Sequence, residues 1–282
     1  MAVVLVTGAS GFIGRGLVLR LKDRHSVIAL SRRDAEGAAA NYRGNFASFE
    51  DLRQLDDVRI DVAVHLAAEI GGTSEEDGLA VNVLGTRRLV RYLLERGCRR
   101  FVLASSIAAA GCLNADFVPE ALPIPARHPC MAKDAYGLSK FLMEGLADYF
   151  ARLHGDAEFV SLRLGAVIES NDPEPDFATT DPPPHLPFLA FGLVGVADVL
   201  AAFEAIVESK HRPGSRVYNV VGPDLRTFEL ASDVLLASLK ERGDGLDLAP
   251  YAMPGHLAPP VYSMRELDED YGFRPIHPVG AV

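Results

Sequence analysis

VLVTGASGFIG, residues 4–14, joins an apolar run to three glycines at positions 8, 11 and 14. Ala2–Thr7 is apolar and β-branched and predicts a buried strand, while the apolar spacing of residues 12–23 predicts a helix. In such a turn the first glycine permits the tight bend, the second admits a pyrophosphate to the backbone N–H groups, and the third lets the helix pack against the strand. The stretch therefore predicts a dinucleotide-binding turn with phosphates at the helix N-terminus; the alternative is a glycine turn without a ligand.

Length and composition narrow the class of protein. The chain has 282 residues, 49% of them apolar, enough for one large α/β domain with or without a small appendage. A formal net charge of -10 argues against nucleic acid as the main partner, and no segment approaches the ~20 consecutive apolar residues that span a bilayer. The start of the chain lacks a signal-peptide pattern, and Cys98, Cys112 and Cys130 form no metal-ligand spacing. We expect a reduced, cytoplasmic enzyme or binding protein without a metal, a nucleic acid or a membrane partner.

Strand-like and helix-like segments alternate along the first two thirds of the chain. The later expected strands are Ser26–Leu30, Asp61–Leu66, Arg100–Ser105, Glu158–Leu164 and Arg216–Val221, and the later expected helices are Leu79–Arg96, Ala135–Leu153, Ala197–Ser209 and Thr227–Glu241. Alternation at this pitch predicts an α/β fold with a doubly wound parallel sheet of the Rossmann type.

Two domains of unequal size are expected. Residues 1–168 are predicted to form the dinucleotide-binding domain, and residues 169–282 a small C-terminal substrate-binding subdomain that returns one strand and one helix (about 196–222) to the sheet. The proline-rich residues 171–187 cannot sustain a helix or a central strand. They are either a plain surface loop or a substrate lid, since they follow the carboxyl end of a sheet strand.

The end of the second strand bears on the choice of dinucleotide. An NAD-binding chain usually has an acidic residue there to hold the ribose 2′-hydroxyl. Here Ser31 occupies that place, Arg32 and Arg33 follow it, and Asp34 comes too late along the chain. A hydroxyl and two guanidinium groups suit a 2′-phosphate. The sequence therefore favours NADP(H), with NAD(H) as the alternative if the two arginines are merely solvated.

Tyr136 and Lys140 begin and end the stretch YGLSK (136–140) and share one face of the expected helix. A phenol, with a reference pKa of about 10, is a weak acid–base group at neutral pH, and a neighbouring ammonium lowers its pKa by stabilising the phenolate. We expect Tyr136 to give a proton to a carbonyl oxygen as hydride arrives, or to take one from an alcohol in reverse. Lys140 is expected to assist it and to reach the nicotinamide ribose.

Further motifs surround this pair. In chain order they are TGASGFIG (7–14), VHLAA (64–68), NVLGT (82–86), LASSIAAAG (103–111), YGLSK (136–140) and LRLGAV (162–167), with later echoes in VADVLAA (196–202), YNVVG (218–222) and YGFRP (271–275). Together they resemble the extended short-chain dehydrogenase/reductase family, which includes sugar-nucleotide epimerases, dehydratases and reductases. The motifs span nearly the whole chain in the family's order, so they are specific for the fold and the cofactor and much less so for the substrate.

The resemblance implies roles for individual residues. Ser106 takes the place of the catalytic serine that holds the substrate oxygen at Tyr136; the alternative is a strand-end serine bonded to nearby backbone. Asn45 stands where the family often has an acidic residue that reaches the adenine, and Asn82 lies either near the active site or on a helix surface. The expected catalytic residues are Ser106, Tyr136 and Lys140, and the expected cofactor-binding residues are Gly8, Ser10, Gly11, Phe12, Ile13, Gly14, Ser31, Arg32, Arg33, Asn45, Phe46, Leu66, Ala67, Ala68, Asn82, Ser105, Tyr136 and Lys140.

Departures from the family pattern narrow the reaction. The 4,6-dehydratases follow the catalytic hydroxyl with Asp-Glu, whereas Ile107 and Ala108 follow Ser106 and cannot transfer a proton, so a dehydratase is not expected. Phe191 stands where sugar-nucleotide enzymes place an arginine on the diphosphate, a second arginine is absent from AMPGHLAPP (252–260), and the family's RP.N motif is altered at residues 163–166. A smaller or more apolar carbonyl or sugar-like substrate is therefore favoured.

Apolar and histidine side chains near the expected cleft have two interpretations. Phe188, Phe191 and Leu193 either line a substrate pocket or belong to a plain core segment. His128 and His185 are expected to be solvated loop histidines.

The function predicted from these observations is an NADP(H)-dependent oxidoreductase that transfers hydride between nicotinamide and a carbonyl or hydroxyl of a small or sugar-like substrate. One alternative is a sugar or nucleotide-sugar epimerase with tightly bound NAD(P), and another is a non-catalytic NADP-sensing regulator. The family resemblance also implies a homodimer formed through the helices at 79–96 and 135–153.

Overall fold

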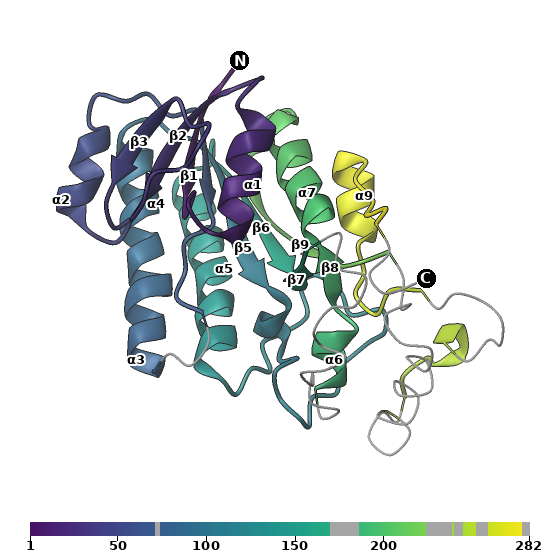
Figure 1. Ribbon diagram of the computed structural model, residues 1–282. Helices are drawn as coiled ribbons and strands as arrows, with labels where there is room; N and C mark the ends of the chain where they lie inside the picture. Colours follow the sequence, from purple (N-terminus) through teal and green to yellow (C-terminus); the bar gives the residue numbers. More distant parts are fainter. Residues whose placement is uncertain (71–73, 170–185, 224–238, 240–244, 252–258, 278–282) are drawn as a thin grey trace. The chain divides into compact units, whose positions relative to one another are not determined.

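A computed structural model describes residues 1–70, 74–169, 186–223, 239, 245–251 and 259–277 (Figure 1). Seven strands form one sheet in the order β3-β2-β1-β4-β5-β6-β9. Their bounds are β1 (Val3–Thr7), β2 (Ser26–Ser31), β3 (Ala40–Arg43), β4 (Val62–His65), β5 (Arg100–Ser106), β6 (Glu158–Leu164) and β9 (Gly214–Val220). The pairs β1–β2, β2–β3, β1–β4 and β4–β5 are parallel. The strand order reverses between β1 and β4, as in a Rossmann fold, so the predicted doubly wound α/β sheet is confirmed.

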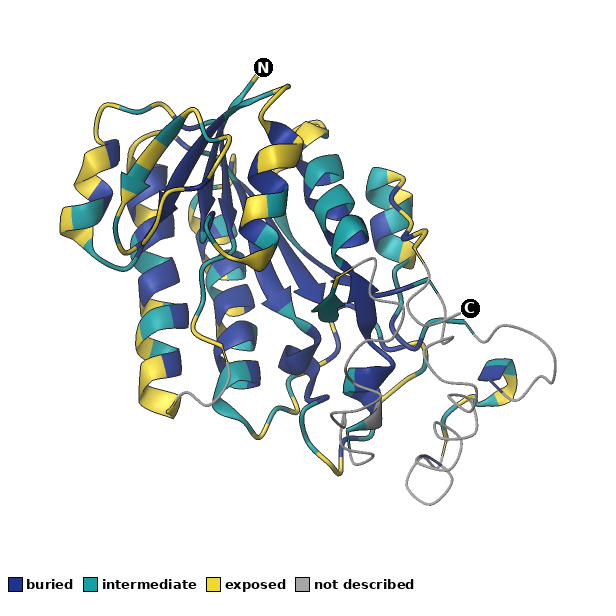
Figure 2. Cartoon of the chain, in the orientation of Figure 1, coloured by how far each residue is buried: buried dark blue, intermediate teal, exposed yellow. Residues whose placement is uncertain are grey.

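Helices cover both faces of this sheet (Figure 1). The α-helices of the described residues are α1 (Phe12–Leu21), α2 (Phe49–Leu52), α3 (Glu75–Gly78), α4 (Thr86–Glu95), α5 (Ala135–Leu153), α6 (Pro187–Ala190), α7 (Val196–Glu208) and α9 (Arg265–Tyr271). Buried side chains of α2, α4 and α5 pack against Leu5, Phe101 and Phe159 of the strands in one continuous core. Because strand side chains alternate, Val4 and Val6 are buried on the opposite face, and Figure 2 shows the sheet as almost wholly buried.

The chain divides into two compact units. The first comprises residues 1–105, 139–162 and 203–217 and contains most of the large sheet. The second comprises residues 106–138, 163–202 and 218–282; it contains the short parallel pair β7 (Ala166–Ile168) and β8 (Leu193–Gly195) and a second apolar core around Ile107, Phe188 and Tyr262.

Most expected elements occur within two residues of their predicted bounds, and α5 and β6 match them fully. The expected helix over Leu79–Arg96 is not one regular α-helix, because a π-helical segment, Leu79–Gly85, joins α3 to α4. Strand β3 was not expected; its residues ANYR alternate between half-buried and exposed positions at the edge of the sheet, so they carry no apolar signal. The expected helix over Thr227–Glu241 and most of the proline-rich stretch 171–187 lie outside the described residues.

The turn between β1 and α1 is held by contact of backbone against backbone. Gly8 has φ +69°, a left-handed conformation that favours glycine, and a Cβ there would lie 2.8 Å from the Ala67 nitrogen. A Cβ on Gly14 would lie 2.2 Å from the Gly8 oxygen. The first and third glycines are therefore required because neighbouring backbone occupies the space of their side chains.

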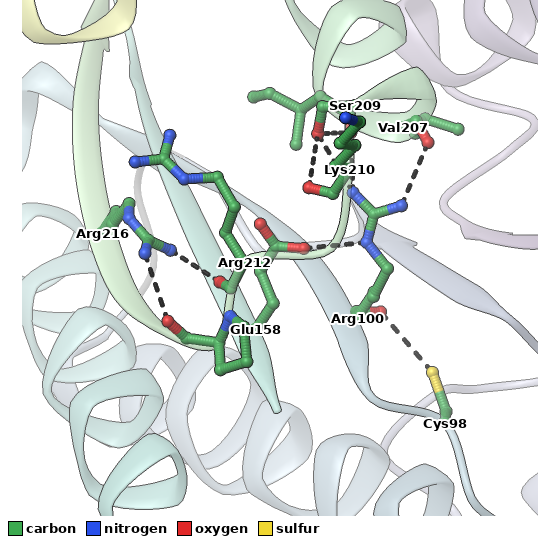
Figure 3. A network of polar contacts seen from close by, with 10 residues as sticks. Cys98, Arg100, Glu158, Val207, Ser209, Lys210, Arg212 and Arg216 are labelled. Atoms are coloured by element: carbon green, nitrogen blue, oxygen red, sulfur yellow. Dashed lines mark hydrogen bonds and ion pairs between the residues drawn. The ribbon is translucent and has the colours of Figure 1, made fainter. Parts of the chain in front are cut away.

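An ion pair between a half-buried arginine and a buried glutamate joins the neighbouring strands β5 and β6 (Figure 3). Arg100, the first residue of β5, donates from Nε to Glu158 Oε2 of β6 at 2.8 Å. The same guanidinium donates to the carbonyl oxygens of Ile206 (3.0 Å) and Val207 (3.3 Å) at the end of α7. A cation at a helix C-terminus satisfies its last carbonyls and complements its dipole, so this contact sets where α7 ends against the sheet.

Replacing Gly14 tests the requirement for backbone contact. Gly14→Ala is expected to lower the free energy of unfolding by about 1–3 kcal/mol, because the turn must open to admit the methyl group. Gly145→Ala, in α5, is the matched control: a Cβ there meets nothing within 4 Å, and removing a helical glycine is expected to stabilise by up to ~1 kcal/mol. Urea unfolding of both variants measures the difference. Equal stability of Gly14→Ala and the wild type would show that the turn tolerates a side chain.

Candidate active site

The glycine turn leads directly into the N-terminus of α1. No side chain caps the backbone N–H groups of this helix end. Gly11 is the N-cap residue, no side chain caps the helix, and its first turn carries no acidic residue. Gly11 and Phe12 are exposed, and Ser10 and Ile13 are half-buried. A helix N-terminus with this composition suits an anion, so the turn fits the pyrophosphate of a dinucleotide. Leu66 and Ala67 adjoin Gly8, and Ala68 follows them half-buried.

The carboxyl ends of β2 and β3 bring basic side chains together. Ser31 is 7% exposed, its hydroxyl donates to the Arg33 carbonyl at 2.5 Å, and Arg32 and Arg33 are exposed. Ser31 pairs in register with Arg43 of β3. Arg43 donates to both carboxylate oxygens of Asp34, at 2.8 and 2.6 Å, and this hydrogen bonding lowers the pKa of Asp34. Sequence reasoning missed Arg43 because it missed strand β3.

Asn45 and Phe46 follow β3. Asn45 is exposed, and its Oδ1 accepts from the Ala47 nitrogen at 2.9 Å, a local turn contact. Phe46 is 8% exposed and meets the ring of His65 edge to face, with centroids 4.7 Å apart. Asn45, the expected adenine neighbour, is therefore more accessible than Phe46.

A buried polar chain, missed from the sequence, joins β1, β4 and α4. His65 Nδ1 lies 2.6 Å from Thr7 Oγ1, and its Nε2 lies 2.9 Å from Thr86 Oγ1. All three side chains are buried, and burial lowers the pKa of His65 to about 3, so the imidazole is neutral. Thr7 Oγ1 also accepts from the Ala67 nitrogen at 3.4 Å. This series of hydrogen-bonded side chains thus fixes the segment after β4 whose backbone contacts Gly8. A histidine within the apolar run VAVHL was the available signal.

Asn82 lies within the π-helical segment and is 2% exposed, so the helix-surface alternative is wrong. Its Oδ1 accepts from the Glu69 nitrogen at 2.8 Å, and its Nδ2 donates to the Glu69 carbonyl (2.9 Å) and to Ser139 Oγ (3.0 Å). Such segments are frequent at functional sites. Asn82 connects the segment after β4 with the residue before Lys140.

Ser106 and Tyr136 are hydrogen-bonded to each other. Ser106 ends β5, and its Oγ also accepts from the Ala108 nitrogen at 3.1 Å, capping the helical turn Ile107–Ala110. A Cβ on Gly137 would lie 2.4 Å from the Ala108 oxygen, so the start of α5 packs directly on that turn. Both hydroxyls were predicted from the sequence. They meet because Gly137, which has no side chain, lets the first turn of α5 approach the turn that follows Ser106.

The pKa of Tyr136 moves opposite to the sequence-based expectation. Burial raises it to about 12, and the hydrogen bond with Ser106 only partly offsets this. Lys140, one turn further along α5, is 3% exposed, and its Nζ donates to the Ala104 carbonyl at 2.7 Å. Burial lowers the pKa of Lys140 to about 8. Desolvation therefore dominates both groups. Ser105, beside Ala104, donates to Glu144 Oε1 at 2.5 Å.

The second unit buries the residues expected near the substrate. Phe188, Phe191 and Leu193 are 2%, 5% and 3% exposed, and Phe188 and Phe191 meet edge to face. His128 is 1% exposed, so the prediction of a solvated loop histidine is wrong: its Nε2 accepts from the Glu120 nitrogen, and burial lowers its pKa. His185 lies outside the described residues.

Arg163, from the altered RP.N motif, is 1% exposed and donates to the His128 carbonyl at 3.1 Å. Within the described residues, no three or more His, Cys, Asp and Glu side chains gather where a metal ion could bind. The helices described there also include none with the length and apolar character needed to cross a membrane.

The chain combines a Rossmann sheet, a glycine turn before an uncapped helix, and a Ser–Tyr pair one helical turn from a lysine. Together these features define the class of extended short-chain dehydrogenases/reductases. Residues 4–180 match the sequence profile of the NAD dependent epimerase/dehydratase family, to which this chain belongs.

Individual relatives agree with this assignment. The chain is 30% identical over 185 residues to a putative UDP-glucose 4-epimerase of Methanocaldococcus jannaschii (61% of this chain, 58% of that protein). It is 31% identical over 183 residues to an L-arabinose 1-dehydrogenase (NAD(P)(+)) of Haloferax volcanii (61% and 70%). It is similar in fold to the Thermus thermophilus UDP-glucose 4-epimerase solved with NAD, with a TM-score of 0.67, 25% identity and coverage of 97% and 94%.

His65 provides a test of the buried polar chain. Its pKa is lower in the folded protein (about 3) than the ordinary pKa of histidine, 6.5, so the unfolded chain binds the proton first as pH falls. The stability that neutral His65 contributes is thus complete above about pH 6.5 and is lost as pH falls toward 3. Between about pH 7 and pH 5 we expect the wild type to lose about 2 kcal/mol more than His65→Gln, measured by urea unfolding.

His211→Gln is the control for this titration, because His211 is exposed. We expect its pH dependence to match the wild type. If the free energy of unfolding of His65→Gln fell between pH 7 and pH 5 as much as that of the wild type, His65 would not be the titrating group.

Proposed function

We propose that this chain is an NADP(H)-dependent oxidoreductase that transfers hydride between nicotinamide and a carbonyl or hydroxyl of a small or sugar-like substrate. The observation that carries the proposal is the hydrogen-bonded pair Ser106–Tyr136 at the end of β5, followed one turn along α5 by the buried Lys140. A sensing protein without chemistry would not need an acid–base pair of this kind.

The residues divide the chemistry between them. In the reductive direction the Tyr136 hydroxyl donates its proton to the carbonyl oxygen, and the Ser106 hydroxyl donates a hydrogen bond that holds this oxygen in place. Burial raises the pKa of Tyr136 to about 12, so the phenol is protonated at neutral pH and ready to act as the acid. Hydride for the carbonyl carbon would come from a nicotinamide cofactor when one is bound at the glycine turn. Lys140, as a cation, stabilises the phenolate that remains after proton transfer.

NADP(H) is the proposed cofactor. Arg32 and Arg33 are exposed next to the hydroxyl of Ser31 at the strand end where an NAD-binding chain usually has an acid. Arg43 adds a third guanidinium near this position, paired with Asp34. NAD(H) is the alternative: the Thermus thermophilus structure contains NAD, and the Haloferax volcanii relative is named for both cofactors.

A small or sugar-like carbonyl compound is the proposed substrate class. Phe191 is buried in an apolar core, and it stands where sugar-nucleotide enzymes of the family place a diphosphate-binding arginine. The C-terminal part of the chain, residues 169–282, is proposed to supply the substrate-binding subdomain. An epimerase is the second candidate, because the Methanocaldococcus jannaschii relative is named as a putative UDP-glucose 4-epimerase.

Two features of the whole protein also remain proposals. We infer a homodimer formed through α4 and α5, supported by the exposed apolar side chains Leu142, Tyr149 and Leu153 on one face of α5. We infer a cytoplasmic location from the absence of disulfides among Cys98, Cys112 and Cys130.

Tyr136→Phe tests the assigned acid. We expect turnover to fall by about 10²-fold or more because the ring loses its transferable proton, while the dissociation constant of NADPH stays nearly unchanged. NADPH absorbance follows the reaction across a set of carbonyl compounds and sugar nucleotides. Stoichiometric NADPH consumption supports the oxidoreductase, substrate conversion without consumption supports the epimerase, and full activity of the variant removes Tyr136 from the mechanism.

The double variant Arg32→Ala, Arg33→Ala tests the cofactor preference. Loss of charge-assisted bonds to a 2′-phosphate is expected to weaken NADPH binding by about 10-fold or more and NADH binding much less. Arg59→Ala is the control, since the Arg59 side chain is 88% exposed and pairs with Asp61. Fluorescence titration gives both dissociation constants. Equal weakening for the two dinucleotides would contradict a 2′-phosphate site here.

A further inference from the structure

Glu144 is a buried carboxylate to which the proposed reaction gives no role. It lies on α5, is 5% exposed, and its Oε1 accepts from Ser105 Oγ at 2.5 Å. Among the described residues, the buried carboxylate of Glu158 is paired with Arg100, and that of Asp198 accepts from the backbone nitrogens of residues 276 and 277. A carboxylate taken out of water needs such compensation. The Ser105 hydroxyl supplies part of this compensation for Glu144.

Lys140 lies one helical turn before Glu144 and is equally buried. Its Nζ donates to the Ala104 carbonyl at 2.7 Å, and Ser105, the partner of Glu144, is the next residue of β5. The ammonium and the carboxylate of α5 thus bind consecutive residues of one strand. Residues four apart on a helix are neighbours, so the two opposite charges face the same strand end together.

The charges of the two groups act on each other. Burial lowers the pKa of Lys140 to about 8, and the negative charge of Glu144 opposes this shift. His65 of β4 also interacts with Lys140, but burial holds its pKa at about 3 and it carries no charge at neutral pH. Tyr136 precedes Lys140 by one turn of α5 and is a neutral phenol there. Of these three groups, Glu144 therefore supplies the charge that offsets the burial of the ammonium.

We propose that Glu144 is a positioning residue: held by the Ser105 hydroxyl, its carboxylate keeps the Lys140 ammonium charged and fixed against β5, one turn from Tyr136. This inference rests on the proposed function in that it gives Lys140 its role beside the acid. Without the carboxylate, burial drives Lys140 toward the neutral amine. A neutral amine does not stabilise a phenolate, and it has fewer N–H donors than the ammonium.

Glu144→Gln removes the charge and keeps the shape and an oxygen that accepts from Ser105. The titration of Lys140 is followed through its ¹³Cε signal in lysine-labelled protein without cofactor or substrate, and Lys140→Met identifies the signal. In the wild type we expect a midpoint near 8, and in Glu144→Gln a midpoint lower by about one pH unit or more. An unchanged midpoint would overturn the proposal.

Asp148→Asn is the matched control. It makes the same change of charge one turn further along α5 at a half-buried position, and the Lys140 midpoint is expected to stay close to that of the wild type. An equal shift in both variants would show a general effect of helix charge and would overturn the specific role of Glu144. If Glu144→Gln does not fold, Ser105→Ala replaces it; loss of the hydroxyl that holds the carboxylate is expected to shift the midpoint down by a smaller amount.

The pH profile of turnover separates positioning from a merely structural role. We expect the limb that reports Lys140 to move to lower pH in Glu144→Gln by the shift seen in the titration, and to stay in place in Asp148→Asn. A lowered Lys140 midpoint with an unmoved profile would overturn the positioning role. Failure of the wild type to turn over any carbonyl compound would contradict the proposed function instead, and the lysine titration still decides whether Glu144 sets the charge of Lys140.

Discussion

Direct contact between backbone segments at the end of β1 is the constraint on which the rest of the structure depends. At Gly8 the turn leaves no room for a side chain because the segment after β4 presses against it, and at Gly14 the helix rests on the turn itself. Close packing of this kind is specific, since a single methyl group forces either the turn or its neighbour to move. The N-terminus of α1 is thereby held at the carboxyl ends of β1 and β4, where open α/β sheets bind their ligands.

A second close approach places the hydroxyl pair. The Ala108 carbonyl occupies the space of a side chain at Gly137, so the first turn of α5 rests on the helical turn that Ser106 caps. Tyr136 then reaches Ser106 because helix and turn are in contact, and the spacing of the helix carries Lys140 to the end of β5. In both cases a glycine in a functional motif is explained by a neighbouring backbone rather than by flexibility.

Buried charges occupy both ends of β5. At its start Arg100 binds Glu158 and the last carbonyls of α7, and at its end Lys140 and Glu144 bind the backbone and side chain of consecutive residues. Buried ion pairs are weak evidence for stability, because desolvation offsets much of their attraction. The value of the charges here is geometric: the Arg100–Glu158 pair contacts the last carbonyls of α7, and the hydrogen bonds of Lys140 and Glu144 hold both groups at the end of β5.

The local pattern of the sequence determined most of the described elements and the choice of candidate site residues. Apolar periodicity predicted α5 and β6 to the residue, the glycine spacing predicted the turn after β1, and the order of the motifs indicated Ser106, Tyr136 and Lys140 together. These features depend on residues that are close in the chain or on a recurrent motif order. Tertiary structure alone decided the edge strand β3 with its pair Arg43–Asp34, the π-helical segment around Asn82 and the burial of His128. It also reversed the direction of the pKa shift of Tyr136. The physical reason is the same for each: desolvation and partner choice depend on atoms that distant parts of the chain bring together, and no local pattern records them.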